Sequence, residues 1–170
     1  MRLRLEAIPD TEKPPIYCML DNVRSLYNVG SMFRTSDGAL IRKLYLCGYT
    51  PHPPRKEIDK TALGSTQSVA WEYHRDAMTA VAAIKTQGAK LCVLEQTTHS
   101  RPYHHISEAD FPICLVVGNE IGGVSPQIIA AADMAIDIPM YGTKQSLNAA
   151  VAYGIALFEL VRIWKAHHST

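Results

Sequence analysis

The segment from residue 113 to residue 125 reads ICLVVGNEIGGVS, and the fold is best approached from it. Its first five residues, 113–117, form a continuous apolar run, which is typical of a strand buried on both faces of a parallel sheet. A second run of this kind, LCVL, occupies residues 91–94. Because parallel strands need long crossover connections, which are usually helices, the two runs predict an α/β fold.

The chain on both sides of these runs alternates between strand and helix patterns. Further short apolar runs predict strands at residues 16–20, 43–47 and 135–139. Helical spacing and capping signals predict helices over 29–40 and 76–87, one beginning at Ser125-Pro126, and a long final helix from Ser146 to about residue 166. We therefore expect a mainly parallel sheet flanked by helices, in one domain that spans residues 1–170.

The predicted final helix carries two apolar stripes. One stripe contains Leu147, Ala150, Val151, Gly154, Phe158 and Val161, and the other contains Tyr153, Leu157, Leu160 and Trp164. One stripe can pack on the sheet, whereas a domain of this size can hardly bury a helix on all sides. The second stripe therefore indicates another partner, and we expect a homodimer.

Composition narrows the class of protein. A hydrophobic content of 47% argues against a disordered chain, and 17 Lys and Arg against 16 Asp and Glu indicate no polyanionic partner by charge alone. The first ten residues, MRLRLEAIPD, lack the apolar core of a signal peptide, and no apolar run is long enough to span a membrane. The four cysteines lie in or beside apolar runs without a CxxC pair, which favours buried thiols in a cytoplasmic protein. The seven histidines lack zinc-ligand spacing, so we expect no metal.

Three unusual segments follow predicted strands, where ligands bind in α/β sheets. They read LDNVRSLYNVGSMFRTSDGA over 20–39, GNEIGG over 118–123, and IPMYGTKQSLNAAVAYG over 138–154. None fits GxGxxG or GxxxxGK[ST], which excludes a dinucleotide fingerprint and a P-loop. Taken alone, GNEIGG could be a tight turn in which Glu120 caps a helix. However, polar residues from all three segments fall at strand–helix junctions, and they are Asn28, Arg34, Asn119, Glu120, Ser146 and Asn148.

Together, the three segments resemble the three motifs of the SpoU (TrmH-like) family of RNA methyltransferases, in the SPOUT superfamily. Motif one corresponds to 28–30 with Arg34 following, motif two to 118–123, and motif three to the residues from Ile138-Pro139-Met140 to Ser146-Leu147-Asn148. The resemblance covers roughly residues 16–165. It implies a C-terminal trefoil knot, S-adenosylmethionine as the cofactor, and a homodimer whose active site lies near the subunit boundary.

The resemblance also implies roles for individual residues. The cofactor-binding residues would be Glu95, Gln96, Gly118, Ile138, Met140, Ser146 and Leu147. The catalytic residues would be Arg34, Asn28, Glu120 and Asn148. Arg34 would activate the attacking hydroxyl, either as its base or as an electrostatic clamp on the phosphate and the developing alkoxide, and Asn28 would orient it. Glu120 would hold Arg34 or the neighbouring backbone.

The implied reaction transfers a methyl group to a ribose 2′-hydroxyl of RNA. Larger relatives that act on ribosomal RNA often carry an N-terminal RNA-binding domain; we expect no separate domain of this kind here, which favours tRNA. The alternatives are the same chemistry on rRNA, methylation of a base, and a non-catalytic RNA-binding or assembly factor. Charge and location alone suggest phosphate contacts at Arg24, Arg42, Lys43, Arg55, Lys56, Lys60 and Lys144.

Overall fold

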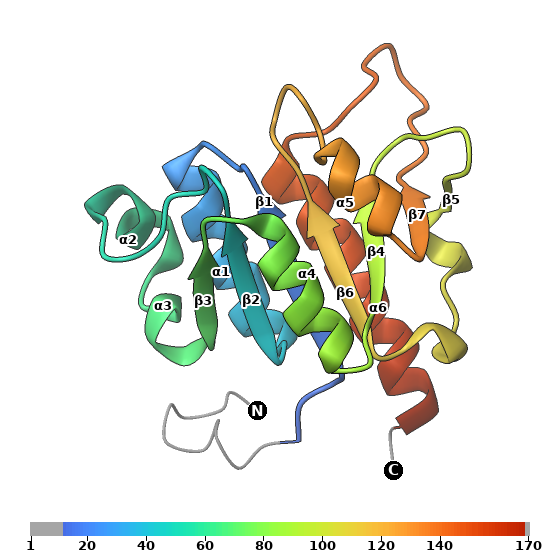
Figure 1. The fold of residues 1–170 in the computed structure, drawn as a ribbon, viewed down its shortest axis with the longest axis horizontal. Coiled ribbons are helices and arrows are strands. Elements are labelled where there is room, and N and C mark those ends of the chain that lie inside the picture. Colours follow the sequence, from blue (N-terminus) through green and yellow to red (C-terminus); the bar gives the residue numbers. More distant parts are fainter. Residues whose placement is uncertain (1–11, 169–170) are drawn as a thin grey trace.

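A computed structural model describes residues 12–168. The N-terminal segment MRLRLEAIPD, which was predicted not to be a signal peptide, lies outside these residues. The described residues form a sheet of seven strands in the order β3-β2-β1-β6-β4-β7-β5 (Figure 1). The strands are β1 (Ile16–Asp21), β2 (Lys43–Cys47), β3 (Trp71–His74), β4 (Lys90–Leu94), β5 (Arg101–Pro102), β6 (Ile113–Val117) and β7 (Met134–Asp137). All six pairings between neighbouring strands are parallel, which confirms the predicted fold class. The strand pairing does not test the trefoil knot, which stays a prediction.

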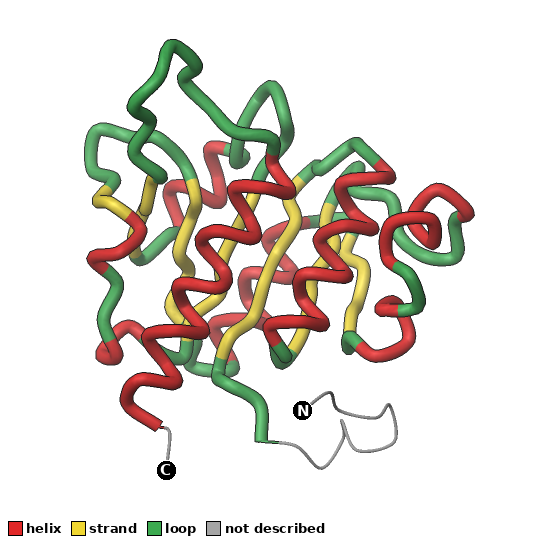
Figure 2. Tube along the Cα trace, turned by 180° about the vertical axis from the view of Figure 1, so that it is seen from behind, coloured by secondary structure: helices red, strands yellow, loops and turns green. Residues whose placement is uncertain are grey.

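Helices cover both faces of the sheet. Figure 2 shows α1 (Leu26–Ala39) and α6 (Ala149–His168) side by side on one face, while α4 (Ala77–Thr86) and α5 (Pro126–Ala131) lie on the other. The remaining helices are α2 (Lys56–Ala62), α3 (Ser65–Ser68) and two short 3₁₀ turns, η2 (Tyr103–His105) and η3 (Glu108–Asp110). We find no helix in this part of the chain that is long and apolar enough to cross a membrane.

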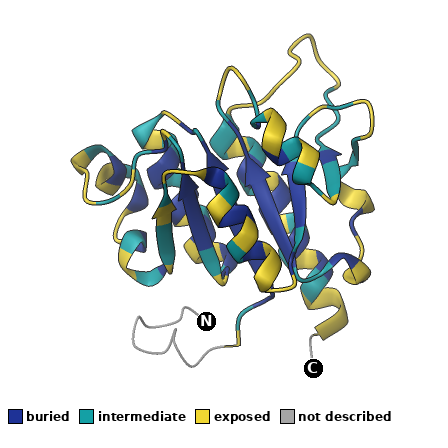
Figure 3. Cartoon of the chain, viewed as in Figure 1, coloured by how far each residue is buried: buried dark blue, intermediate teal, exposed yellow. Residues whose placement is uncertain are grey.

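The two helix layers explain why the central strands are continuously apolar. Along β1, Cys18 and Leu20 join the core beneath α1 and α6, whereas Tyr17 and Met19 join the core beneath α4 and α5. Successive side chains of a strand point to opposite faces, so a strand covered on both sides has no polar positions. Figure 3 shows these strands as the buried centre of the molecule.

All four cysteines are free and buried, as their apolar surroundings predict. Burial raises the pKa of the Cys18, Cys47 and Cys92 thiols to about 12, and it raises the pKa of Cys114 well above its ordinary value. These side chains therefore act as small apolar groups of the core.

Two strands were not predicted. The edge strand β3 is half-buried and carries the mixed sequence WEYH, and β5 has only two residues, so neither shows the apolar run that marks a central strand. The polar loop that contains Arg101 therefore joins the sheet, and Arg101 pairs in register with Ile136 of β7.

Two helix starts and the role of one predicted cap also differ from the prediction. α1 begins at Leu26 and not at residue 29. α6 begins at Ala149 and not at Ser146, because the Asn148 side-chain oxygen accepts the N–H groups of Ala150 (2.9 Å) and Val151 (3.3 Å). Ser125 precedes α5 as expected, but its hydroxyl donates to a carboxylate oxygen of Asp21 (2.6 Å) instead of capping the helix.

The glycine of motif one is required by helix packing. A side chain at Gly30 of α1 would overlap the carbonyl oxygen of Ile58 and the hydroxyl of Thr61 on α2. The same hydroxyl donates to the Tyr27 carbonyl oxygen at 2.9 Å. Gly30 thus sets the close approach of α2 to the start of α1.

The two stripes of α6 have different surroundings. Tyr153, Leu157 and Leu160 are buried, and the Tyr153 hydroxyl hydrogen-bonds the Ser36 hydroxyl at 2.6 Å. In contrast, Val151 is 51% exposed and Phe158 is 49% exposed. The exposed stripe is the face that the homodimer prediction requires, and the dimer itself stays a prediction.

A cluster of charges fixes the loop between β5 and β6. The largely buried Asp110 side chain accepts hydrogen bonds from Arg101 (3.0 Å), Lys90 (3.4 Å) and the Ser107 N–H (3.0 Å). Burial raises the pKa of Asp110, but these three partners lower it by more, so the pKa lies below its ordinary value. The ionised form is therefore the one that stabilises the fold.

Replacing Asp110 with asparagine is expected to lower the free energy of unfolding by about 2 kcal/mol at pH 7, because two cations lose their partner. Since the folded pKa is depressed, this stabilisation is present above the unfolded pKa of about 3.9 and is lost as the pH falls below it. Urea denaturation of both proteins at pH 7 and pH 3 would measure the difference. Asp59→Asn, at an exposed position, is the control. If Asp110→Asn lowered the free energy of unfolding equally at both pH values, the stabilisation would not come from the ionised carboxylate.

Candidate active site

Segments that follow three strands, β4, β6 and β7, meet at the carboxyl edge of the sheet and form a pocket of about 290 Å³. The loop after β1 lies along the same edge (Figure 1). The pocket itself is lined by residues 94–96, 117–123, 137, 138, 140, 145–147, 149 and 152. This volume lies at the lower end of the range for small-molecule sites.

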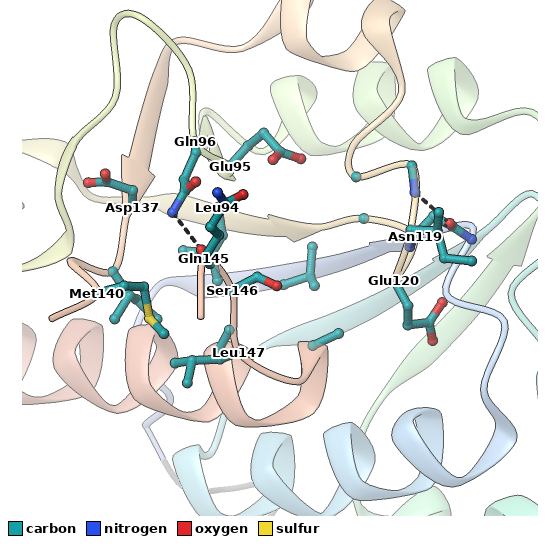
Figure 4. A pocket seen from close by; sticks show the side chains of 18 residues that line it. Leu94, Glu95, Gln96, Asn119, Glu120, Asp137, Met140, Gln145, Ser146 and Leu147 are labelled. Carbon is teal, nitrogen blue, oxygen red and sulfur yellow. Dashed lines mark hydrogen bonds between the residues drawn. The ribbon is translucent and has the colours of Figure 1, made fainter. Parts of the chain in front are cut away.

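The structure brings together every residue predicted to bind the cofactor. Glu95, Gln96, Gly118, Ile138, Met140, Ser146 and Leu147 all line this pocket. Figure 4 shows Gln96, Asp137 and Met140 at one end of the pocket, and Asn119 and Glu120 at the other. The arrangement places polar groups beside apolar walls, although the binding roles themselves stay predictions.

Two polar side chains at the end of β4 join the loops to one another. The Gln96 side-chain amide donates to the carbonyl oxygen of Gln145 at 3.0 Å (Figure 4). One carboxylate oxygen of Glu95 accepts the Val124 N–H at 2.9 Å. Glu95 therefore positions the loop after β6 as well as lining the pocket.

The glycines of motif two are needed by the turn that they form. Asn119 and Gly123 exchange two backbone hydrogen bonds of 2.9 Å, and Gly123 has a φ of +70°. The Asn119 side-chain oxygen accepts the N–H groups of Ile121 (3.0 Å) and Gly122 (2.9 Å). A side chain at Gly118 would overlap the backbone of Gly123 and Val124. The sequence therefore specifies a closed turn, and we refer to residues 118–123 as the motif-two turn.

Glu120 connects this turn to the start of α1. Its carboxylate accepts the backbone N–H groups of Arg24 and Ser25, both at 3.1 Å, and the Asn28 side-chain amide at 3.4 Å. The Asn148 amide in turn donates to the Asn28 side-chain oxygen at 3.3 Å. A chain of hydrogen bonds thus links one residue from each motif.

The carboxyl of Glu120 is held in its ionised form. Burial raises its pKa, but the hydrogen bonds that it accepts lower the pKa by more, so the net value lies below the ordinary one. A carboxylate with several N–H donors has little tendency to take up a proton at neutral pH. The structure therefore assigns Glu120 to holding the backbone and Asn28, which was one of the two roles expected for it.

Within its own chain, Arg34 does not take part in the hydrogen bonds that link Glu120, Asn28 and Asn148. It is exposed, it does not line the pocket, and its side chain has no hydrogen bond or ion pair with any residue in the range 12–168. Six residues along a helix separate it from Asn28 by about 9 Å. The expectation that Asn28 orients Arg34 is therefore not met inside one subunit, because the Asn28 amide is engaged by Glu120 and Asn148.

Arg34 lies on the solvent-exposed side of α1. Gly38 is one helical turn further along, and a Cβ at Gly38 would lie 3.6 Å from the Phe158 ring of α6. Arg34 thus borders the exposed stripe of α6 and not the pocket of its own chain.

Within the described part of the chain, no three His, Cys, Asp or Glu side chains are grouped so that they could hold a metal ion.

Comparison with known proteins places the chain in a family. Residues 15–158 match the model of the SpoU rRNA Methylase family. The chain belongs to this family. The resemblance drawn from the three motifs is thereby confirmed, and with it the assignment as an RNA methyltransferase.

Relatives of this SpoU methylase are similar over nearly its whole length. A tRNA (guanosine(18)-2′-O)-methyltransferase from Aquifex aeolicus is 34% identical over 162 residues, which cover 94% of this chain and 74% of the relative. The crystal structure of the A. aeolicus TrmH/SpoU tRNA-modifying enzyme superposes with a TM-score of 0.84 at 30% identity, covering 96% of this chain and 82% of that one. The AdoMet-bound rRNA methyltransferase from Sinorhizobium meliloti gives a TM-score of 0.83 at 27% identity, covering 96% and 61%.

Some lining residues of this SpoU methylase were not predicted. Asp137 ends β7 at the carboxyl edge of the sheet, and this position alone could have suggested it. Gln145 contributes its backbone carbonyl to the bond with Gln96, and no sequence pattern marks a backbone contact of this kind.

Replacing Gly118 with alanine is expected to lower the free energy of unfolding by about 1–3 kcal/mol, because the added methyl group must displace the backbone of the motif-two turn. Since this turn lines the pocket, binding of S-adenosylmethionine should weaken as well. Thermal unfolding and calorimetric titration would measure the two effects. Gly142→Ala is the matched control, as nothing lies within 4 Å of the new Cβ; equal stability of the two variants would contradict the overlap.

Proposed function

We propose that this chain transfers a methyl group from S-adenosylmethionine to the ribose 2′-hydroxyl of an RNA, with tRNA as the substrate. The observation that carries the proposal is the hydrogen-bonded chain from Glu120 through Asn28 to Asn148 at one end of the pocket. It joins the three motifs at a single site. The similarity to the A. aeolicus relative, which is a tRNA 2′-O-methyltransferase, supports this choice of acceptor.

The residues around the pocket fit S-adenosylmethionine. Ile138, Met140 and Leu147 offer apolar walls for a base, and Glu95 and Gln96 offer polar groups for ribose hydroxyls. The motif-two turn lets backbone groups approach a ligand closely. When bound, the cofactor supplies an electrophilic methyl group.

The protein must in turn activate the ribose 2′-hydroxyl of the RNA. A ribose hydroxyl is a weak nucleophile, so a group that stabilises negative charge on its oxygen accelerates the reaction. The Arg34 guanidinium has five donors and no acceptor, which favours the electrostatic clamp over the base. Its planar donors also suit a neighbouring phosphate.

The position of Arg34 supports a homodimer. Arg34 does not line the pocket of its own chain, and it lies one helical turn before Gly38, which faces Phe158 of the exposed α6 stripe. Two copies packed through this stripe would bury the apolar side chains and bring Arg34 of each copy towards the other. In the proposed dimer, Arg34 acts at the pocket of the partner subunit.

Transfer of a tritiated methyl group to undermodified total RNA, separated into tRNA and rRNA, tests the function. Label on tRNA at a nucleotide whose phosphodiester resists alkaline cleavage would support ribose methylation of tRNA. Label on rRNA would overturn the proposed substrate, and label on an alkali-sensitive nucleotide would favour base methylation. The absence of both cofactor binding and methyl transfer would overturn the catalytic role and favour the RNA-binding factor.

A further inference from the structure

A second groove lies beside the pocket on the same edge of the sheet. Its volume is about 680 Å³, and Asn119, Gly122 and Gly123 line both it and the pocket. The motif-two turn is therefore a wall that the two share. The opposite side of the groove comes from the loops after β1 and β2, through Arg24, Tyr49 and Arg55 (Figure 1). A polymer whose reacting unit lies at the mouth of the pocket can thus continue into the groove.

The Tyr49 side chain is highly exposed in this groove, yet its backbone is firmly held. Its side chain is 83% exposed, while its N–H donates to the Asn22 side-chain oxygen at 2.8 Å. The next residue, Thr50, is buried; its hydroxyl donates to the Cys47 carbonyl oxygen (2.7 Å) and accepts the Val23 N–H (3.1 Å). An aromatic ring on such a fixed support loses little entropy when it binds.

The support depends on two residues in the left-handed backbone region. Asn22 has a φ of 55° and Gly48 a φ of 65°, and a side chain at Gly48 would overlap the Asn22 amide. The Tyr73 hydroxyl also donates to the Gly48 carbonyl oxygen at 2.8 Å. The loops after β1 and β2 are therefore joined so that Tyr49 is presented to solvent in one place.

The groove is positively charged. Arg24 and Arg55 line it, and none of its lining residues is acidic. The Arg24 side chain is exposed and makes no hydrogen bond or ion pair within residues 12–168. Arg55 has only a loose ion pair of 3.8 Å with Glu57, and both side chains are exposed. The two guanidinium groups are thus available to an anionic ligand.

We propose that this groove is a nucleotide subsite of the RNA substrate, in which Tyr49 stacks on a base next to the modified nucleotide and Arg24 and Arg55 bind the flanking phosphates. An exposed ring between two cations suits an unpaired nucleotide, because every base offers a face for stacking. A base within a duplex cannot offer that face. The subsite therefore selects RNA that is single-stranded at the modified position, such as a loop. This inference rests on the proposed function and specifies its substrate.

Equilibrium binding of RNA to the full chain tests the subsite without turnover. The probes are an unmodified tRNA transcript, a fluorescent single-stranded oligoribonucleotide and a duplex of the same sequence, with S-adenosylhomocysteine present. Tyr49→Ala is expected to weaken binding of the single strand and the transcript roughly tenfold, and to leave duplex binding unchanged. Tyr49→Phe should keep the affinity. Leu63→Ala, which removes another exposed apolar side chain outside the groove and outside the three motifs, is the control.

The arginines are tested by salt dependence. Combining Arg24→Gln with Arg55→Gln is expected to lower the slope of log affinity against log salt by about 1 to 2, because up to two phosphate contacts are lost. In the methylation assay, Tyr49→Ala should raise the KM for RNA and leave kcat nearly unchanged. If Tyr49→Ala had a KM and an affinity equal to those of Leu63→Ala, the subsite would be overturned, as it would be by an equal loss of duplex binding.

These outcomes separate the subsite from the proposed function. Wild-type protein that methylates RNA while Tyr49→Ala retains full affinity would overturn the subsite alone. Wild-type protein that binds the single strand through Tyr49 but transfers no methyl group would overturn the proposed function alone. Wild-type protein that binds none of the three RNAs would overturn both.

Discussion

Replacing Arg34 with alanine is expected to lower the rate of methyl transfer at least about a hundredfold, while the affinity for S-adenosylmethionine stays unchanged. Removal of one donor that stabilises a developing oxyanion typically reduces the rate 10²- to 10³-fold. Arg34 is exposed and lies outside the cofactor pocket, so neither folding nor cofactor binding depends on it. Single-turnover transfer to tRNA measures the rate, and calorimetric titration measures the affinity.

Two further variants make this result specific. Arg34→Lys keeps the charge but loses the planar pair of donors, so it should recover only part of the rate. Arg42→Ala removes another exposed arginine, which directly precedes β2 and so lies at the amino edge of the sheet. This position is away from the pocket, so the phosphate contact that charge alone suggested for Arg42 is not expected there. If Arg34→Ala and Arg42→Ala were equally active, the catalytic assignment of Arg34 would be wrong.

The sequence predicts the central sheet because its strands are buried on both faces. The runs at 113–117 and 91–94 became β6 and β4 with nearly the expected bounds. The edge strands β3 and β5 were missed because a half-covered or two-residue strand need not be apolar. Periodicity therefore reports how deeply an element is buried, and it is least informative where the sheet meets solvent.

The candidate pocket could be assembled from the sequence because motif and strand order together place its residues at one edge. The structural reason for each residue was harder to predict from the sequence. Gly118 is a glycine because the backbone at 123–124 occupies the space of a side chain, and Glu95 is partly engaged by the Val124 N–H. Contacts between backbone segments distant in sequence leave no periodic signal.

The same limit applies to Arg34 and to the quaternary structure. In the sequence, Arg34 follows Asn28 by six residues. This spacing does not show that the two side chains have different surroundings in the fold. Likewise, two apolar stripes were visible in the sequence, and only the fold shows which one stays exposed. The cytoplasmic location and the lack of a separate RNA-binding domain stay predictions.

Replacing Phe158 with glutamate is expected to convert a dimer into monomers and to abolish methyl transfer. Phe158 is 49% exposed in the single chain, so a charged side chain there can remain hydrated and the subunit should stay folded. In a dimer packed through the α6 stripe, two buried carboxylates without partners would oppose association. Analytical ultracentrifugation would report the mass, and circular dichroism the fold. Leu63→Glu, at the exposed apolar C-cap position of α2, is the control and should change neither mass nor activity.

The expected loss of activity when the dimer dissociates follows from the position of Arg34. A monomer contains the pocket and Arg34 at separate places, so the clamp has no hydroxyl to act on. Mixing Arg34→Ala with Met140→Arg, whose pocket is filled, would create dimers in which the intact pocket of the first chain receives Arg34 from the second. Recovered activity in that mixture, from two inactive parents, would support action across the interface. A fully active Phe158→Glu monomer would contradict it, because Arg34 would then have to reach the pocket of its own chain.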